Sequence, residues 1–414
     1  MTRRAAAVAY CALAVFTCYW LVRLAYADET LRLESVASAQ HSLRLASGNP
    51  QAYAVISERA IANGNTAQGL AAIRRAVELD PSNPFLWEDY ADAAEKAKDP
   101  GLAEQCLLRW VDVGHTFAPR SALADFYARR NDPVRFWPAM RAALATSFGD
   151  VSDLFEMCWS VSAQSAGPET IPALALPRRP DVARQYIDFL ESKNRLDLAR
   201  PVALKLLRDD PANSVDTLES DCDRELAAGN GEPARILWDG LISSNVPGRH
   251  LLPYPPLVPE QGRDVTNGDF RHAFLDTGFD WHMAASSGIY ATHDETAGEA
   301  RFEFTGNEDE RAELMSEYVS LLPERRHELQ VTYQTKDMPQ STGIHWELTQ
   351  AKTLLDAELP ASDQQPRTAR FAFTVPEGIH AARLICRYER SPGTVRAKGL
   401  LRIKSVAIRL GSAS

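Results

Sequence analysis

The sequence lacks the short motifs that identify common catalytic centres. It has no G-x-S-x-G, H-E-x-x-H or G-x-G-x-x-G segment and no phosphate-binding P-loop, so the usual signatures of serine hydrolases, zinc peptidases and nucleotide-binding enzymes are missing. Its nine histidines follow no metal-ligand spacing. We interpret the paired acids at 294–295 and 308–310 as solvated loop charge rather than as the two carboxylates of a glycosidase. We therefore predict no catalytic residue, no cofactor and no metal site.

Disulfide and zinc frameworks are missing as well. The six cysteines stand at positions 11, 18, 106, 158, 222 and 386, with no C-x-x-C and no paired spacing, so neither framework is predicted. The formal net charge is -10, and no block of lysines and arginines alternates with aromatic residues. The composition therefore argues against nucleic acid as a partner. With 414 residues, 45% hydrophobic and 24% charged, the chain is globular and long enough for two domains behind a leader.

Long apolar runs are scarce, and the one that decides topology lies near the N-terminus. An arginine pair precedes an apolar run over residues 5–22, which is about long enough to cross a bilayer core as a helix. The small-x-small segment at 25–27 would suit a signal peptidase, but the run is long for a signal core and Arg23 interrupts the approach to that site. We favour a retained, single-pass transmembrane helix within residues 1–27. The arginine pair then places the N-terminus in the cytoplasm, the helix in the inner (cytoplasmic) membrane and the rest of the chain in the periplasm.

The chain also contains a repeat of 34 residues. Matching residues at this interval are Pro50 and Pro84, Tyr53 and Trp87, Ile56 and Tyr90, Ala60 and Ala94, Ile73 and Leu107, and Val77 and Val111. A helix-turn-helix unit of this length buries its apolar stripe only by stacking on another copy. The pattern resembles the tetratricopeptide repeat, and the resemblance implies a protein-binding scaffold rather than an enzyme.

Helical periodicity continues downstream of the two clear copies. The interval from Pro180 to Pro211 equals that from Pro50 to Pro81, and we predict one all-α solenoid over residues 28–246, with a helix over 28–47 at its start. In the tetratricopeptide family the first helix of each pair usually faces the binding groove. The resemblance therefore implies a groove for a protein partner, lined by Glu58, Arg59, Glu88 and Asp92.

The helical pattern ends at a proline-rich stretch. Residues 247–263 contain five prolines, which neither a helix nor a sheet can accommodate in series, so the stretch is predicted to be an extended connector. Within residues 264–414 apolar and polar residues alternate in short segments at 279–283, 300–304, 329–333, 344–348, 371–375, 384–388 and 401–404. Such a series without helical interludes predicts an all-β antiparallel sandwich. The predicted fold is multidomain: a transmembrane helix, a helical solenoid and a sandwich.

Three segments of the last third resemble the jelly-roll family of carbohydrate-binding modules related to galactose-binding-like domains. Asn267-Gly268-Asp269-Phe270 is similar to the opening strand, Gly278-Phe279-Asp280-Trp281 to the second strand, and residues 402–408 to the closing strand. The resemblance implies a jelly roll that holds a polysaccharide. Such modules often bind calcium through an acidic residue in the closing strand, where this sequence has Lys404 and Ser405. Calcium is therefore not predicted.

Alternation along the strands assigns side chains to the two faces of a sheet. Trp281 and Trp346 each share a face with apolar neighbours two residues away, so both are predicted to lie in the core. The polar residues that alternate with each tryptophan on its own strand point to the opposite face of the sheet, where they could bond sugar hydroxyls. The predicted carbohydrate-binding residues are Asp280, His282, His345 and Glu347. An ordinary solvated sheet face is the alternative, and the sequence leaves it open.

Two functional hypotheses follow. The first is a membrane-anchored, non-catalytic adaptor of the bacterial cell envelope, which binds protein partners through the solenoid and a polysaccharide through the sandwich. The second is a glycan-processing or glycan-modifying enzyme, in which the sandwich holds the substrate and the solenoid recruits it.

Overall fold

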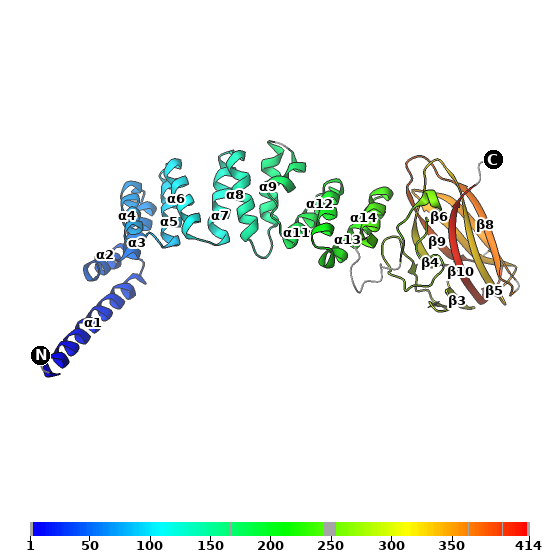
Figure 1. Ribbon diagram of the computed structural model, residues 1–414, viewed down its shortest axis with the longest axis horizontal. Coiled ribbons are helices and arrows are strands. Elements are labelled where there is room, and N and C mark those ends of the chain that lie inside the picture. The colour runs from blue at the N-terminus through cyan, green and yellow to red at the C-terminus, as the bar shows by residue number, and fades with distance from the viewer. Residues whose placement is uncertain (1–2, 166, 244–253, 363, 391, 412–414) are drawn as a thin grey trace. The chain divides into compact units, whose positions relative to one another are not determined.

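The computed structural model describes residues 3–165, 167–243, 254–362, 364–390 and 392–411 (Figure 1). Contacts between Cα atoms divide the chain into two compact units, residues 1–185 and 186–414. The first unit is helical, and the second combines the last helices with all of the strands. Residues 247–253 of the predicted connector lie outside the described residues.

The N-terminal helix α1 runs over Arg3–Leu31. Its stretch Ala7–Leu31, 25 residues with a mean hydropathy of 1.7, is long and apolar enough to cross a membrane, a property that signal sequences near an N-terminus share. The helix continues past residue 27, so the single helix predicted over 28–47 is wrong. A turn at Glu34, with φ of 42°, interrupts it. Ser35 then caps α2 (Val36–Leu45) through the backbone N–H of Ser38, as a serine at an N-cap commonly does.

Three helix pairs follow in the first unit. Their bounds are α3 (Pro50–Ala62) with α4 (Thr66–Leu79), α5 (Pro84–Lys96) with α6 (Pro100–Val113), and α7 (Phe117–Arg129) with α8 (Pro133–Thr146). Asn49 and Asn83, 34 positions apart, cap α3 and α5 and are each followed by a proline at the first helical position. Proline suits that position because its missing N–H would be unpaired there in any case. The caps therefore set the repeat register that the sequence predicts.

The repeat becomes irregular after the third pair. Helix α9 (Ser152–Ala163) is followed by a short 3-10 turn at Pro168–Thr170 and by the four-residue helix α10 (Ile171–Leu174). Helix α11 (Pro180–Ser192) contains the division between the two units at residues 185 and 186. The second unit continues with α12 (Leu196–Asp209), α13 (Pro211–Ala227) and α14 (Gly231–Ser243). Helix pairs therefore make up most of the chain before residue 244.

The C-terminal part of the second unit is a sandwich of two five-stranded antiparallel sheets. The first sheet has the order β1-β4-β9-β6-β7 and the second β2-β3-β10-β5-β8. The strands are β1 (His282–Met283), β2 (Ile289–Asp294), β3 (Glu299–Thr305), β4 (Arg311–Ser320), β5 (Arg326–Lys336), β6 (Ser341–Gln350), β7 (Lys352–Pro360), β8 (Arg367–Thr374), β9 (Ala381–Glu389) and β10 (Lys398–Leu410). This arrangement confirms the predicted antiparallel sandwich.

The tryptophans of the sandwich lie in its core, as predicted. Trp281 and Trp346 are fully buried, and their ring centroids are 6.3 Å apart in an edge-to-face arrangement, a geometry that aromatic pairs favour. The predicted strand over 279–283 is wrong in extent, because only residues 282 and 283 pair with β4. The segment 267–270 likewise forms a turn rather than an opening strand, and the N–H of Val406 in β10 donates to the Gly268 carbonyl at 2.8 Å.

Helices and sandwich are in direct contact within the second unit. The Asp223 carboxylate of α13 accepts hydrogen bonds from the Thr277 hydroxyl at 2.8 Å and from the Gly278 N–H at 2.7 Å. On α14, Asp239 accepts a hydrogen bond from the Leu257 N–H at 2.9 Å. Residues 254–281 therefore contact the last two helices and lead into the first sheet, which Gly231 of α14 also meets at Ala381 of β9.

Candidate functional site: a polar sheet face and an acidic helix face

Strand register brings polar residues together on the outward face of the first sheet. His282 on β1 is paired with Ser316 on β4, and Ser316 with Ile385 on β9. Ile385 is paired with Glu347 on β6, and Glu347 with Asp356 on β7. Residues in register across a sheet point to the same side. His282, Glu347 and Asp356 therefore share one face, opposite the buried Trp346.

Arg387 is the centre of this face. Its Nε donates to Glu347 at 2.9 Å, its Nη2 donates to Asp356 at 2.7 Å, and its Nη1 is bonded to Glu389. The Arg387 side chain is only 8% exposed. Burial lowers the pKa of this guanidinium, but the charges of Asp356 and Glu389 and the bond to Glu347 outweigh that effect and raise the pKa overall. Arg387 is therefore a fixed cation among three carboxylates.

His345 completes what we call the Arg387 cluster: His345, Glu347, Asp356, Arg387 and Glu389. The Nδ1 atom of His345 lies 2.9 Å from the Asp356 carboxylate. Hydrogen bonds within the cluster hold its side chains in fixed orientations, while Asp356 and Glu389 remain 41% and 45% exposed. Such a rigid array of donors and acceptors suits recognition of a hydroxyl-rich ligand.

The structure separates the four residues predicted to bind carbohydrate. His345 and Glu347 lie in the Arg387 cluster, and His282 lies on the same face but three strands away, where it is bonded to Asp276. Asp280 is buried, with 3% of its surface exposed. Its Oδ2 accepts hydrogen bonds from the Tyr254 hydroxyl at 3.2 Å and the Leu275 N–H at 2.7 Å. Asp280 therefore does not lie on the predicted outward face, because it precedes the short strand β1 and turns inward.

One aromatic residue on this face is not among those predicted from the sequence. Tyr318 on β4 is half-buried and paired with Arg383 on β9. Arg383 donates to Glu313 at 2.6 Å and to the Ser316 hydroxyl at 3.0 Å. A tyrosine ring beside fixed polar groups is the arrangement with which proteins contact the apolar faces of sugars. A bulge between Glu313 and Met315 shifts the register of β4, and so strict alternation cannot assign its side chains.

The predicted groove residues lie on the first helices of two consecutive pairs. Glu58 on α3 and Asp92 on α5 are exposed and occupy equivalent positions 34 residues apart. Glu88 and Asp89 lie on α5 beside Asp92, and we call these four carboxylates the acidic row. Desolvation raises the pKa of Asp89, and the charges of Asp92 and Glu58 raise it further. No basic side chain in the described ranges forms a salt bridge with the acidic row.

Arg59 differs from the other predicted groove residues. Its Nε donates to the Glu34 carbonyl at 2.8 Å, and its Nη2 lies 3.5 Å from the Glu34 carboxylate. These contacts join α3 to the turn between α1 and α2. Arg59 is therefore engaged within the chain. The acidic row forms no salt bridge among the described residues, although the charge of Lys96 is close enough to lower the pKa of Asp89.

Asp264, Asp280 and Glu317 are among the buried carboxyls of the second unit. Both carboxylate oxygens of Asp264, one oxygen of Asp280 and one of Glu317 lack a hydrogen-bond partner. Burial raises the pKa of Asp264 to about 8 and that of Asp280 to about 7, and it raises the pKa of Glu317 well above its ordinary value. Among the described residues no group of three histidine, cysteine or acidic side chains could hold a metal ion. The carboxyls are therefore interior groups that favour the protonated form.

Comparison with known proteins gives likenesses of fold alone. No family model matches the sequence, and no curated protein matches it. YrrB, described as a TPR protein with an unusual peptide-binding site, is 14% identical with a TM-score of 0.26, covering 52% of this chain and 96% of its own. PilW, described as a widely conserved type IV pilus biogenesis factor, is 14% identical with a TM-score of 0.26, covering 57% and 97%. A CBM4 structure is 11% identical with a TM-score of 0.28, covering 36% and 99%.

TM-scores this low carry no argument about function. The fold rests instead on the helix pairs and the two sheets themselves: tetratricopeptide-like pairs are followed by an antiparallel sandwich of the kind that carbohydrate-binding modules use.

Proposed function

We propose that this protein is a membrane-anchored, non-catalytic adaptor of the bacterial cell envelope. The observation that carries the proposal is the pairing, in one chain, of an acidic helix-repeat face whose carboxylates form no salt bridge in the part of the chain that the structure describes and a sheet face that displays fixed polar groups. Helix repeats present extended binding surfaces, and a polar sheet face suits a polysaccharide. The two surfaces would connect a protein partner to a glycan.

The contacts of α1 support its retention in the mature chain. Ala27 is fully buried against the first helices, and the Asn49 side-chain amide donates to Asp28 at 2.8 Å. The Arg23 Nε donates to the Leu45 carbonyl at 2.7 Å. Cleavage after residue 27 would remove the partner on which α2 packs. An uncleaved helix with a cytoplasmic N-terminus and a periplasmic solenoid fits these contacts.

The acidic row indicates the chemistry of the protein partner. Four carboxylates that form no salt bridge within the described ranges create a negative potential, which attracts a segment rich in lysine or arginine and accelerates its association. The pKa of Asp89 is raised by burial and further by the charges of Asp92 and Glu58, and a bound cation would relieve the repulsion from those two charges. A basic peptide segment of an envelope protein is the partner we propose.

The sandwich offers little support for the catalytic hypothesis. A glycosidase needs an acid with a raised pKa that can reach the glycosidic oxygen. Among the described residues of the sandwich, the aspartate and glutamate side chains with raised pKa are Asp264, Asp280 and Glu317, and all three are at least 97% buried. The exposed carboxylates of the Arg387 cluster are bonded to Arg387 and suit binding. We therefore favour the adaptor over the enzyme.

Site-specific crosslinking in cells tests the protein-binding half of the proposal. A photoreactive residue at Asp92, within the acidic row, should capture a basic partner, and Glu58→Lys in the same chain should abolish the capture. A probe at Glu78, which is already paired with Arg75 at 3.0 Å, serves as the matched control. Equal capture from both positions, or capture that survives Glu58→Lys, would refute a specific acidic binding face.

A further inference from the structure

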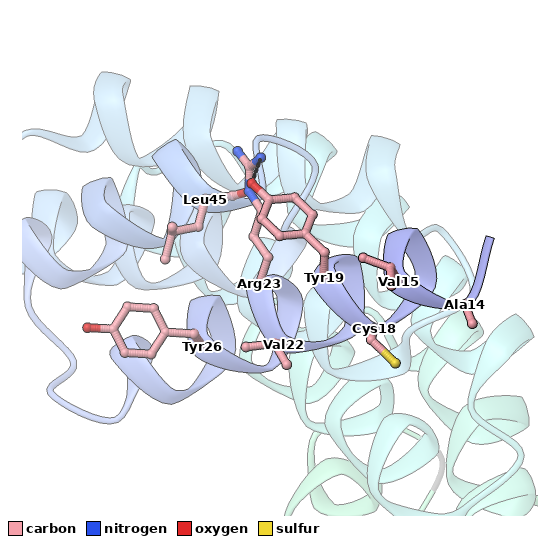
Figure 2. A pocket seen from close by; sticks show the side chains of 8 residues that line it. All are labelled: Ala14, Val15, Cys18, Tyr19, Val22, Arg23, Tyr26 and Leu45. Atoms are coloured by element: carbon pink, nitrogen blue, oxygen red, sulfur yellow. Dashed lines mark hydrogen bonds between the residues drawn. The ribbon is translucent and has the colours of Figure 1, made fainter. Parts of the chain in front are cut away.

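An apolar groove lies where α1 meets the end of α2 (Figure 2). Its volume is about 900 Å³, at the upper end of the range of roughly 300–1,000 Å³ for small-molecule sites, and it is open along one side. The lining residues are Ala14, Val15, Cys18, Tyr19, Val22, Arg23, Tyr26 and Leu45. The walls are almost entirely apolar, and the Arg23 guanidinium lies beside the Tyr19 hydroxyl, with the Tyr26 hydroxyl apart from both.

Arg23 is held in place but keeps free hydrogen-bond donors. Its Nε donates to the Leu45 carbonyl at 2.7 Å, its Nη2 to the Arg44 carbonyl at 3.3 Å, and its Nη1 to the Tyr19 hydroxyl at 3.4 Å. A guanidinium has five N–H donors, so two remain for a ligand. The carbonyls at the C-terminus of α2 offset only about half of its positive charge.

A second arginine, Arg44, contacts Arg23 through its backbone carbonyl. Arg44 is exposed, and its Nη2 contacts the ring of His41 at 3.2 Å. Within the described part of the chain neither Arg23 nor Arg44 forms a salt bridge, whereas Arg32, at the far end of α1, is bonded to Glu29 at 2.9 Å. Where α1 meets the end of α2, the chain therefore carries two arginines without a carboxylate partner.

The position of Arg23 along α1 matches the edge of a bilayer. At 1.5 Å per residue, the apolar stretch over residues 5–22 spans about 27 Å, close to the ~30 Å of a hydrocarbon core. Arg23 follows that stretch directly. Val15, Cys18 and Val22 then lie at the depth of acyl chains, and the two guanidinia lie at the depth of lipid phosphates.

We propose that this groove binds one anionic phospholipid, with an acyl chain along Val15, Cys18 and Val22 and the phosphate between Arg23 and Arg44. The inference rests on the proposed retention of α1 in the membrane. Guanidinia bind phosphate with paired hydrogen bonds, which gives the lipid a defined position. A second copy of this chain would bring the same two cations into contact and would be repelled. Charge complementarity therefore selects the lipid as the occupant.

Fluorescence quenching of the full-length protein in vesicles tests the proposal. Trp20 is the reporter, because the Arg23 guanidinium lies 4.9 Å from its ring centroid, and Trp20→Phe defines its share of the signal. Two vesicle preparations would be compared, both made mainly of phosphatidylcholine. One contains a small fraction of brominated phosphatidylglycerol, and the other contains the same fraction of brominated phosphatidylcholine. We expect the brominated phosphatidylglycerol to be enriched at Trp20 roughly fivefold for each guanidinium.

Variants separate the lipid site from the anchor. Arg44→Gln, which removes only a contact with His41, should lower the preference without disturbing the helices, and Arg23→Gln should lower it further. Arg32→Gln, the matched control, should leave the preference for phosphatidylglycerol unchanged.

The outcomes distinguish the lipid site from the anchor. If the protein floats with the vesicles and both brominated lipids quench Trp20 equally, the lipid site is refuted and the anchor stands. Floating protein with unquenched Trp20 would place a second copy in the groove, and protein that does not float would refute the anchor and the lipid site together.

Discussion

Trp238 on α14 lies directly against Gly278 in the segment that precedes β1. A Cβ atom at position 278 would come within 2.4 Å of a ring carbon of Trp238, and the φ angle of Gly278 is 58°. The Trp238 ring also packs on Phe279, with centroids 6.2 Å apart. Position 278 therefore requires glycine for two reasons: its backbone has a positive φ, and the indole of Trp238 occupies the space that a side chain would need.

The first prediction concerns this contact. Gly278→Ala should lower the free energy of unfolding of the second unit by about 2–4 kcal/mol, since strain at positive φ and overpacking add to each other. Gly378→Ala is the matched control, because Gly378 has a φ of 76° and no atom within 4 Å of the added Cβ. Thermal unfolding of residues 186–414 would measure both. If the two variants lose the same stability, Trp238 does not hold the helices against the sandwich.

The second prediction concerns pH. An aspartate in an unfolded chain ionises near pH 3.9, whereas the folded pKa is about 8 for Asp264 and about 7 for Asp280. The folded unit therefore keeps protons that the unfolded chain has released, and its stability should fall as the pH rises from about 4 to about 8. Urea unfolding of residues 186–414 across this range would measure the slope.

Asp264→Asn isolates one contributor to that slope, because asparagine cannot ionise. The variant should lose less stability between acidic and alkaline pH than the parent. The exposed Asp309→Asn serves as the control and should leave the slope unchanged. A variant at position 264 with the parental slope would show that its carboxyl does not titrate inside the fold.

The fold could be predicted from the sequence wherever local rules act alone. The caps at Asn49 and Asn83 and the alternation in β6, with Trp346 inside and His345 and Glu347 outside, follow from neighbouring residues. Alternation fails in β4, where the bulge turns Glu317 into the core.

Alternation also fails before β1, where Phe279, Asp280 and Trp281 are all buried. Contacts between distant segments cause both failures of alternation, the one in β4 and the one before β1. The bond between the Tyr254 hydroxyl and Asp280 and the packing of Trp238 on Gly278 join positions that no local pattern relates. The roles predicted for His282, His345 and Glu347 in sugar binding, and for Glu58, Glu88 and Asp92 in protein binding, remain predictions.

The third prediction concerns the repeat register. Ala94 on α5 is fully buried, so Ala94→Trp should overpack the helix interface and cost about 1–3 kcal/mol. Lys96→Trp, at an exposed position of the same helix, is the control and should shift stability by no more than about 0.5 kcal/mol. Helical circular dichroism during thermal unfolding would compare the two. An unchanged melting temperature for Ala94→Trp would mean that the interface is elsewhere.

The fourth prediction distinguishes a core tryptophan from a sugar platform. Trp346→Ala should cost about 3–5 kcal/mol, because it leaves a large cavity beside Trp281. Thr349→Ala, on the outward face of the same strand, should cost little. Chemical unfolding of residues 186–414 would measure both changes. A Trp346→Ala protein of normal stability that no longer binds glycan would reverse the assignment of the two faces.

The fifth prediction concerns the Arg387 cluster. Replacing His345 and Glu347 by alanine should keep the fold, because Arg387 retains Asp356 and Glu389 as partners. The cost should be about 1 kcal/mol for each of the two lost hydrogen bonds, one to Arg387 and one to Asp356. Sugar binding should weaken about tenfold, since each bond to a sugar hydroxyl contributes about 0.5–1.5 kcal/mol. Circular dichroism would establish that the variant is folded before its affinity is compared with that of the parent.

The most direct test of the adaptor model measures glycan binding and glycan cleavage in the same preparation. Full-length protein in detergent would be applied to a glycan array while the release of reducing ends from the same glycans is followed. The model predicts binding that the His345→Ala, Glu347→Ala double variant weakens, with no reducing ends released by either protein. Release of reducing ends by the parent protein, or binding that is indifferent to the double variant, would contradict a non-catalytic glycan-binding role for this sheet face.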